Sequence, residues 1–316
     1  MAAGLQTACA ACGGGPLRPH LRVAGEMGSE GLVPTTDRFG TALADVVRCR
    51  ACGHMQLARM PSDAELSEAY GEAESEDYVE EEAGQRATAA AVLAAVERYV
   101  PPAGAPGAEW IPAGESRSGR RLLDLGCWVG FLLAEAESRG WEAVGIEPSE
   151  FASSHARSRG LDVRTGDLLA ADLPAAAFEA VVLGDVIEHL PRPGEALDRI
   201  AALLAPGGVL VLMVPDAGSR LARAMGRRWW SVIPTHVQYF TRASLRTLLE
   251  RHGYAVLEVG TQPKAFTVGY YLSRISGYSR PLGRALVAAA RRAGLADRLW
   301  APDFRDRMLV IARGRA

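Results

Sequence analysis

The chain has 316 residues, of which 48% are hydrophobic, and its 35 basic and 37 acidic residues leave a formal net charge of −2. This length suffices for one catalytic domain and a small accessory module. The charge balance argues against a nucleic-acid partner, because such proteins usually carry a basic excess or patch. Neither a membrane-spanning apolar run nor a signal peptide is evident, so we expect a cytoplasmic protein whose cysteines bind metal or pack rather than form disulfides.

Four of the five cysteines lie near the N-terminus in two Cys-x-x-Cys pairs, which are Cys9, Cys12, Cys49 and Cys52. Each pair can direct two thiolates at one ion, and two pairs complete a closed tetrahedral S4 shell of the structural kind. Gly13 and Gly53 follow the second cysteines and suit a tight turn. Packed thiols or a redox pair are the alternatives, although a redox pair usually lies near a βαβ pattern. We therefore predict a zinc module over residues 1–60, in which the ion substitutes for a large core.

Residues 61–119 are predicted to connect this module to a second domain. The acidic composition of 61–84 indicates a solvated connector. Apolar side chains at helical spacing predict a helix over 85–99. Residues 101–119 are rich in proline and glycine, which is typical of a linker.

Residues 120–316 are predicted to form the second domain, in which short apolar segments alternate with helical ones. The predicted strands are 121–125, 142–146, 161–164, 179–184, 208–214, 254–259 and 307–313, and the predicted helices are 129–139, 149–159, 192–204 and 241–252. This alternation favours an α/β fold with a doubly wound, seven-stranded and mostly parallel sheet. Ligands of such sheets bind beyond the carboxyl ends of the strands.

Between the last two predicted strands lies a substrate-side insert, residues 261–305, which is too long for a hairpin and should be helical in part. Its predicted helix around 282–292 is basic and amphipathic. We interpret that helix as an exposed face, with a membrane or an acidic partner as the alternative.

The first strand of the second domain is followed by a glycine-bearing turn and the start of a helix. Gly126 permits a tight turn, and Gly130 lets the helix pack near a ligand. A dinucleotide fingerprint would place glycine where this chain has Trp128 and Phe131. Because a pyrophosphate needs bare backbone at the second glycine, NAD or FAD is disfavoured.

Acidic residues follow three successive strands. Asp124 could hold the cationic amino-acid end of S-adenosylmethionine, and Glu147 could accept hydrogen bonds from both ribose hydroxyls. Asp167 could bind the adenine amine. Each acid alone could cap a helix instead, but three acids in register favour a binding site.

These segments together resemble class I S-adenosylmethionine-dependent methyltransferases. The resemblance runs from Arg121 to Pro215 and rests on DLGCWVG, VGIEPS, TGDL, VVLGDVIEHL and LLAPGGVLVLMVP, with Trp128 where the family usually has glycine. With its cysteine pairs, the whole chain is similar to zinc-headed methyltransferases of natural-product and sugar pathways. The sugar C-methyltransferases among them are longer and carry an added C-terminal domain, so the resemblance does not single out that substrate class. The resemblance implies S-adenosylmethionine contacts at Asp124, Gly126, Cys127, Gly130, Glu147, Pro148, Asp167, Leu168 and Asp185. We expect the Cys127 thiol to pack in the turn rather than to act as a nucleophile.

Two segments are candidates for the acceptor side. In Gly184–Leu190, His189 could be a general base or a hydrogen-bonded support for the loop. Trp229–Phe240 contains an H-x-x-Y-F pattern similar to that of related methyltransferases. There His236 and Tyr239 could be a base or contact the acceptor, or they could pack under the next helix.

The two tryptophans of this second segment, Trp229 and Trp230, could form an acceptor wall or pack in the core. Thr241 is the predicted N-cap of the following helix.

The sequence thus predicts methyl transfer from S-adenosylmethionine, by in-line displacement, to a small-molecule or saccharide acceptor in secondary-metabolite or glycan biosynthesis. An RNA methyltransferase that grips its substrate through the zinc module is one alternative. A catalytically silent cofactor-binding module is another. A homo-oligomer is compatible with the sequence.

Overall fold

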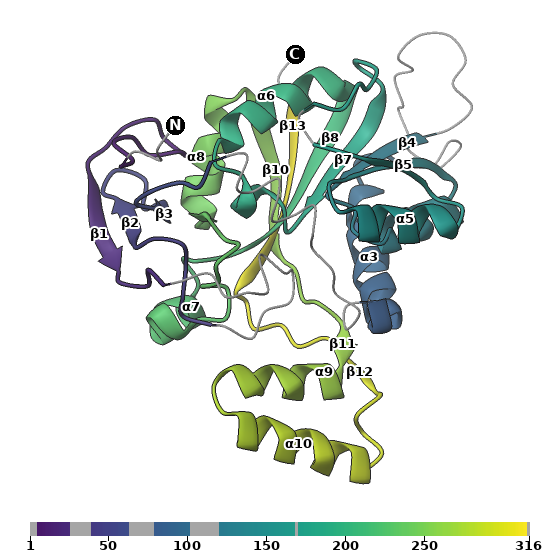
Figure 1. The fold of residues 1–316 in the computed structure, drawn as a ribbon. Coiled ribbons are helices and arrows are strands. Elements are labelled where there is room, and N and C mark those ends of the chain that lie inside the picture. Colours follow the sequence, from purple (N-terminus) through teal and green to yellow (C-terminus); the bar gives the residue numbers. More distant parts are fainter. Residues whose placement is uncertain (1–4, 26–38, 63–78, 102–119, 168–169, 315–316) are drawn as a thin grey trace.

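The computed structural model describes residues 5–25, 39–62, 79–101, 120–167 and 170–314 (Figure 1). The predicted linker at 101–119 and most of the acidic connector at 61–84 lie outside these ranges, as does Leu168. The predicted helix that follows the connector is present, but it begins earlier, as α3 (Glu82–Val96).

A seven-stranded sheet forms the centre of the molecule, with the order β10-β13-β8-β7-β4-β5-β6. Its strands are β4 (Arg120–Leu125), β5 (Trp141–Glu147), β6 (Asp162–Thr165), β7 (Phe178–Gly184), β8 (Leu204–Pro215), β10 (Tyr254–Thr261) and β13 (Arg307–Gly314). β13 is antiparallel to both of its neighbours, β10 and β8, and the other four strand pairs of this sheet are parallel. The predicted seven-stranded, mostly parallel sheet is therefore confirmed.

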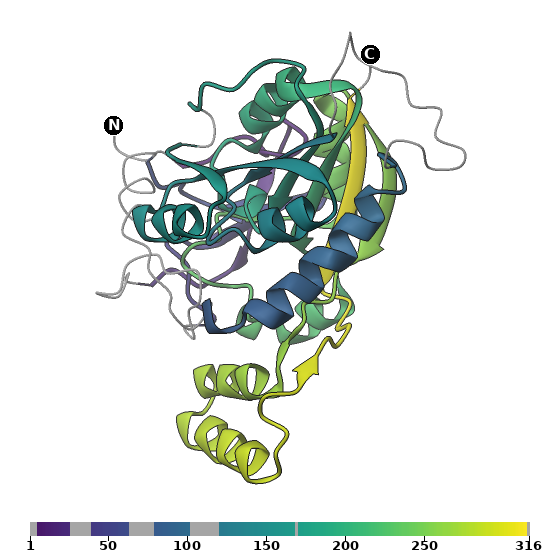
Figure 2. The same ribbon diagram turned by 90° about the vertical axis from the view of Figure 1, so that its right-hand side faces the viewer.

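Helices cover both faces of this sheet because successive strand residues point to opposite sides. On β4, Leu123 packs in one core with α6 (Pro193–Leu203) and α8 (Arg242–Arg251), whereas Leu122 packs in a second core with α3, α4 (Phe131–Ser138) and α5 (Glu150–Ser158). Both residues are fully buried. Figure 2 shows α3 along the outside of the sheet.

A smaller antiparallel sheet carries the cysteine pairs and lies beside the central domain (Figure 1). Its strand order is β1-β2-β3-β9, with β1 (Leu17–Leu21), β2 (Val46–Cys49), β3 (Met55–Leu57) and β9 (Gln238–Tyr239). Met55 pairs with Tyr239 and Gln56 with Gln238. The N-terminal segment therefore takes its last strand from the H-x-x-Y-F segment near the other end of the chain.

The insert at 261–305 forms a helical hairpin that projects from the body, as Figures 1 and 2 show. It contains β11 (Phe266–Thr267), α9 (Val268–Ser273), the 3-10 turn Arg274–Gly277, α10 (Arg280–Arg292) and β12 (Leu299–Trp300). The prediction of a partly helical insert is confirmed. Among the residues that the structure describes, no helix is long and apolar enough to cross a membrane.

The base of the insert docks on α3 at a glycine. A Cβ on Gly84 would lie 2.3 Å from the backbone oxygen of Ala265. The carboxylate of Glu81 accepts hydrogen bonds from the Thr267 amide (2.7 Å) and hydroxyl (2.6 Å). The insert is thus held to the helix that precedes the first strand of the domain.

We predict that Gly84→Ala destabilises the protein by about 1–3 kcal/mol, since an added methyl group would push backbone against backbone. Helix propensity alone predicts the opposite sign, a gain of about 1 kcal/mol. Chemical denaturation measures the change. Ala91→Gly, on the exposed face of the same helix, calibrates the propensity contribution. An increase in stability for Gly84→Ala would contradict the packing argument.

Candidate functional site

Most of the predicted cofactor residues lie at the carboxyl ends of β4 and β5, next to the point where the strand order reverses between β4 and β7. In the turn after β4, Gly126 has φ +77°, and a Cβ there would lie 2.5 Å from Val186 Cγ2 on the loop after β7. Trp128, in place of the family's usual glycine, adopts φ +50°. A left-handed conformation costs a non-glycine residue about 1–2 kcal/mol, so surrounding contacts must hold this turn.

Glu147 supplies one of those contacts. Its Oε2 accepts a hydrogen bond from the Trp128 amide and its Oε1 accepts one from the Ser149 amide, both at 2.8 Å. The carboxylate thus joins the turn after β4 to the start of α5, which Ser149 caps through its side chain. Each carboxylate oxygen has a second lone-pair direction that can serve a ligand hydroxyl.

Asp124 and Glu147 form a buried acidic pair, each 5% exposed. Burial raises the pKa of Asp124 to about 7, and the neighbouring Glu147 adds to that shift. Burial likewise raises the pKa of Glu147 to about 7, against the lowering effect of its two amide donors. A cationic ligand would favour the ionised forms of both acids.

The other predicted cofactor residues are distributed around this pair. Cys127 is buried with its Sγ over Gly145, where a Cβ would lie 2.5 Å from the sulfur, and burial raises the pKa of the thiol. Gly130 is the N-cap residue of α4, and its Cα lies against the Leu161 side chain. Pro148 is half-buried, while Asp167 is exposed at the end of β6. Cofactor contacts at these positions stay predictions, and Leu168 lies outside the described residues.

Asp185 follows β7 and has φ +57°. Its carboxylate forms ion pairs with Lys264, the only lysine of the chain, and with Arg307 at the start of β13. Although burial opposes ionisation, these two cations lower the pKa of Asp185. The insert therefore contributes a charged side chain to the end of β7, a link that the sequence analysis missed.

The predicted acceptor-side histidines lie together. The rings of His189 and His236 meet edge to face, with centroids 4.7 Å apart. His189 Nδ1 lies 2.9 Å from the Thr235 carbonyl oxygen, and His236 Nδ1 lies 2.9 Å from that of Ser231. Burial lowers the pKa of His189 to about 4 and that of His236 well below its usual value. Both imidazoles are therefore neutral near pH 7, with the proton on Nδ1.

Two further side chains, Tyr239 and Glu188, lie beside the two histidines, and we call these four residues the histidine cluster. Tyr239 is buried, its ring centroid lies 6.4 Å from that of His236, and burial raises the pKa of its hydroxyl. Glu188, which precedes His189 in the turn Ile187–His189, is 1% exposed. The sequence analysis did not select Glu188, although an acid beside a histidine was visible in the D-V-I-E-H pattern.

The tryptophans and the helix cap have distinct places. Trp229 is buried in the core that the small sheet shares with the segment before β9, and its Nε1 donates to Asp306 Oδ2 at 3.0 Å. Trp230 lies against the half-exposed ring of Phe304, with centroids 5.6 Å apart. Thr241 caps α8 through its side chain, which confirms that prediction.

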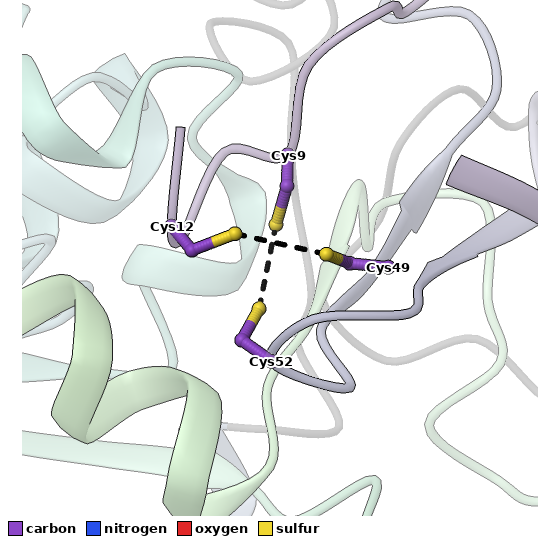
Figure 3. Close-up of side chains that lie close together, drawn as sticks. All are labelled: Cys9, Cys12, Cys49 and Cys52. Carbon is purple, nitrogen blue, oxygen red and sulfur yellow. Dashed lines mark hydrogen bonds between the residues drawn. The ribbon is translucent and has the colours of Figure 1, made fainter. Parts of the chain in front are cut away.

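The four N-terminal cysteines converge from two turns, with their sulfurs directed at a common centre (Figure 3). The Sγ atoms of Cys9 and Cys52 are 3.6 Å apart, as are those of Cys12 and Cys49. A tetrahedral zinc site with Zn–S bonds of about 2.3 Å has sulfurs about 3.8 Å apart. All four cysteines are free, and the four sulfurs fit such an ion.

Backbone amides support this arrangement. Those of Ala11 and Cys12 point at the sulfur of Cys9, and those of Ala51 and Cys52 point at the sulfur of Cys49. Amide donors of this kind stabilise thiolates. As expected, the glycine after each pair has positive φ, +72° for Gly13 and +76° for Gly53.

Comparison with known proteins agrees with this geometry. Residues 89–259, more than half of the chain, match the family model described as a methyltransferase domain. A probable S-adenosylmethionine-dependent methyltransferase of Mycolicibacterium smegmatis is 28% identical over 189 residues, which are 58% of this chain and 68% of that protein. A ubiquinone biosynthesis O-methyltransferase of Caulobacter sp. strain K31 is 36% identical over 102 residues, which are 30% of this chain and 40% of that enzyme. The chain thus spans less than half the length of that relative.

Solved structures similar to this one include a possible histamine N-methyltransferase of Thermotoga maritima, at 16% identity and a TM-score of 0.47, with 76% of this chain and 94% of that chain covered. Magnesium protoporphyrin IX methyltransferase of Synechocystis PCC 6803 has 16% identity and a TM-score of 0.46, with 78% and 91% covered. From its family match and its sheet, this chain belongs to the class I S-adenosylmethionine-dependent methyltransferases and is an enzyme.

Proposed function

We propose that this enzyme methylates a hydroxyl group of a small-molecule or saccharide acceptor in secondary-metabolite or glycan biosynthesis. The observation that carries the proposal is the juxtaposition of two polar clusters at one edge of the sheet. The acids Asp124 and Glu147 lie at the ends of β4 and β5, and the histidine cluster lies around His189, in the turn that follows β7, the strand adjacent to β4. A donor held by the first cluster can face an acceptor held by the second.

The residues around the turn after β4 fit S-adenosylmethionine. Buried carboxylates suit a ligand with a positive charge and vicinal hydroxyls, and we assign the amino-acid end to Asp124 and the ribose to Glu147. Asp167, exposed beside them at the end of β6, is assigned to the adenine. When bound, S-adenosylmethionine supplies an electrophilic methyl group on a sulfonium.

The acceptor side contains neutral, buried bases. His189 and His236 carry their protons on Nδ1, so that each Nε2 presents a lone pair. We assign His236, with His189 and Tyr239 beside it, to contact the acceptor and to take up its proton. Relatives of this chain include enzymes named as ubiquinone O-methyltransferases, which favours oxygen as the methylated atom. The balanced charge disfavours RNA as acceptor.

We further propose that the four cysteines bind one structural zinc ion. The tetrahedral spacing of the sulfurs and the amide donors around them support this assignment. Four protein thiolates leave no open position, so the ion serves folding rather than chemistry.

The proposal is tested by turnover of methyl-labelled S-adenosylmethionine with panels of phenols, hydroxylated metabolites, nucleotide sugars and RNA. Transfer to a hydroxylated small molecule or sugar supports it. Transfer to RNA, with steeply salt-dependent binding, would replace it with the RNA methyltransferase alternative. Tight donor binding without transfer to any panel would favour the silent module instead.

The acidic pair also predicts a pH dependence of donor binding. Because the pKa values of Asp124 and Glu147 are raised to about 7, the free enzyme holds protons there at pH 6 that a cationic ligand must displace. Affinity should therefore fall as pH drops below 7, up to about tenfold per pH unit for each acid that must ionise. Calorimetry at pH 6, in two buffers of different ionisation enthalpy, should detect proton release. Asp124→Asn should reduce that release, and an affinity that is flat from pH 5.5 to 8.5 would contradict the assignment.

A further inference from the structure

The histidine cluster contains a buried carboxyl group, that of Glu188, which accepts no hydrogen bond from the described residues. Glu188 is 1% exposed, and no donor among the described residues reaches either of its carboxylate oxygens. The two nearby cations, Lys264 and Arg307, instead bind Asp185. A carboxyl group buried without a partner either stays protonated or pairs with a cation.

The neighbours of Glu188 supply the rest of a metal-binding set. One ligand atom from each of Glu188, His189 and His236 lies within 4.8 Å of the others. Metal bonds of about 2.1 Å to nitrogen and oxygen bring such atoms within about 4.2 Å of one another, so small side-chain rotations would close the cluster on an ion. Of the three residues, His189 is half-buried, while Glu188 and His236 are buried.

The hydrogen bonds that the two imidazoles make through Nδ1 also fit a metal site. Metal-bound histidines almost always donate their second ring N–H to a carbonyl or a carboxylate, which fixes the tautomer and the ring orientation. His189 and His236 do so through Nδ1, toward the carbonyls of Thr235 and Ser231. The Val237 amide also donates to the Glu188 carbonyl oxygen at 3.0 Å, which ties the two segments that carry the ligands.

We propose that Glu188, His189 and His236 bind a first-row divalent transition-metal ion, separate from the four-cysteine site. Two imidazoles and one carboxylate suit Zn²⁺, Fe²⁺, Mn²⁺ or Co²⁺ rather than Mg²⁺ or Ca²⁺, which prefer all-oxygen shells. Three protein ligands leave at least one open position, as in catalytic metal sites.

The role of the ion rests on the proposed function, although its presence does not. With its Nε2 on the ion, His236 could no longer take up the acceptor proton, and the ion would take over its role, because a hydroxyl bound at the open position would become more acidic. Its proton leaves to solvent, and an oxygen lone pair forms the O–C bond to the methyl group. The electrons of the broken C–S bond return to sulfur, which leaves as a neutral thioether.

Metal stoichiometry tests the site. The full-length protein is equilibrated with Zn²⁺, separated from free ion by gel filtration, and analysed for zinc per chain. We expect Glu188→Gln and His236→Ala each to bind one equivalent less than the wild type. His20→Ala, which removes an exposed histidine on β1, should bind as much as the wild type. Equal zinc content in the wild type and in both site variants would overturn the proposal.

Cobalt spectroscopy provides a measurement that does not depend on the folding of a variant. Co²⁺ in the four-thiolate site gives intense thiolate-to-metal charge-transfer bands, whereas Co²⁺ bound by imidazole and carboxylate gives only weak visible bands. Titration of the wild type should therefore show a second phase without charge transfer, and pulsed EPR should detect coupled imidazole nitrogens. A single phase of thiolate type would refute the site. Affinity for S-adenosylmethionine, measured on the same samples, reports separately on the proposed function.

Discussion

Glu147→Ala is expected to lower the affinity for S-adenosylmethionine about 100-fold. The substitution removes a carboxylate that we assign to two ribose hydroxyls, and hydrogen bonds to charged groups contribute about 1.5–3 kcal/mol each. It also removes the acceptor for the Trp128 and Ser149 amides, so the turn that must hold Trp128 at positive φ loses a support. Isothermal calorimetry with the donor measures the change. Thermal unfolding checks that the fold persists.

Matched variants separate the cofactor contact from a general effect of losing an acid. Glu150→Ala changes the first residue of α5, whose side chain is 71% exposed and pairs with Arg157 on the surface, and it should leave donor affinity unchanged. Asp124→Ala should weaken binding as Glu147→Ala does. Wild-type affinity in both Asp124→Ala and Glu147→Ala would remove the cofactor assignment.

The central domain could be predicted from the sequence because its signals are local. Buried strands such as β8 alternate between two cores, and each is followed or preceded by a helix with one apolar face. The acids at the ends of β4 and β5 come close together because parallel strands place their carboxyl ends on one edge. Periodicity and strand direction alone therefore indicated where Asp124 and Glu147 would lie.

The parts that escaped prediction depend on contacts between distant segments. Nothing near Gln238 indicates that it joins β3, yet its Oε1 lies 2.9 Å from His54 Nε2, across 184 residues of sequence. Likewise, no local pattern pairs Asp185 with Lys264 and Arg307. Such pairings are set by tertiary packing, and the periodicity of apolar residues in the sequence does not reveal them. Glu188 was missed for a related reason, since its burial becomes apparent only once both flanking segments are in place.

The shared strand links the cysteine cluster to the proposed acceptor side. β9 lies between the cysteine-bearing sheet and the histidine cluster, since Tyr239 pairs with Met55 and the Val237 amide bonds to Glu188. The cysteine turns also touch the central domain directly, because Arg251 of α8 donates to the Ala11 carbonyl oxygen at 2.9 Å. An ion that orders the cysteine turns would therefore support the acceptor side more than the cofactor side.

Removal of the proposed zinc ion should consequently have a large and local effect. Structural zinc contributes about 10–16 kcal/mol to folding in isolated zinc-finger peptides, so chelation or Cys49→Ser should abolish the order of the β1-β2-β3 sheet and lower Tm markedly. Hydrogen exchange should accelerate in 233–241, which loses its pairing with β3, while β4 and β5 keep their protection and donor affinity changes little. Cys127→Ala, which removes the fifth cysteine, should retain the zinc content of the wild type. Purified protein that is folded and cooperative without any metal, or equal exchange in 233–241 with and without zinc, would show that the cysteine turns do not need an ion.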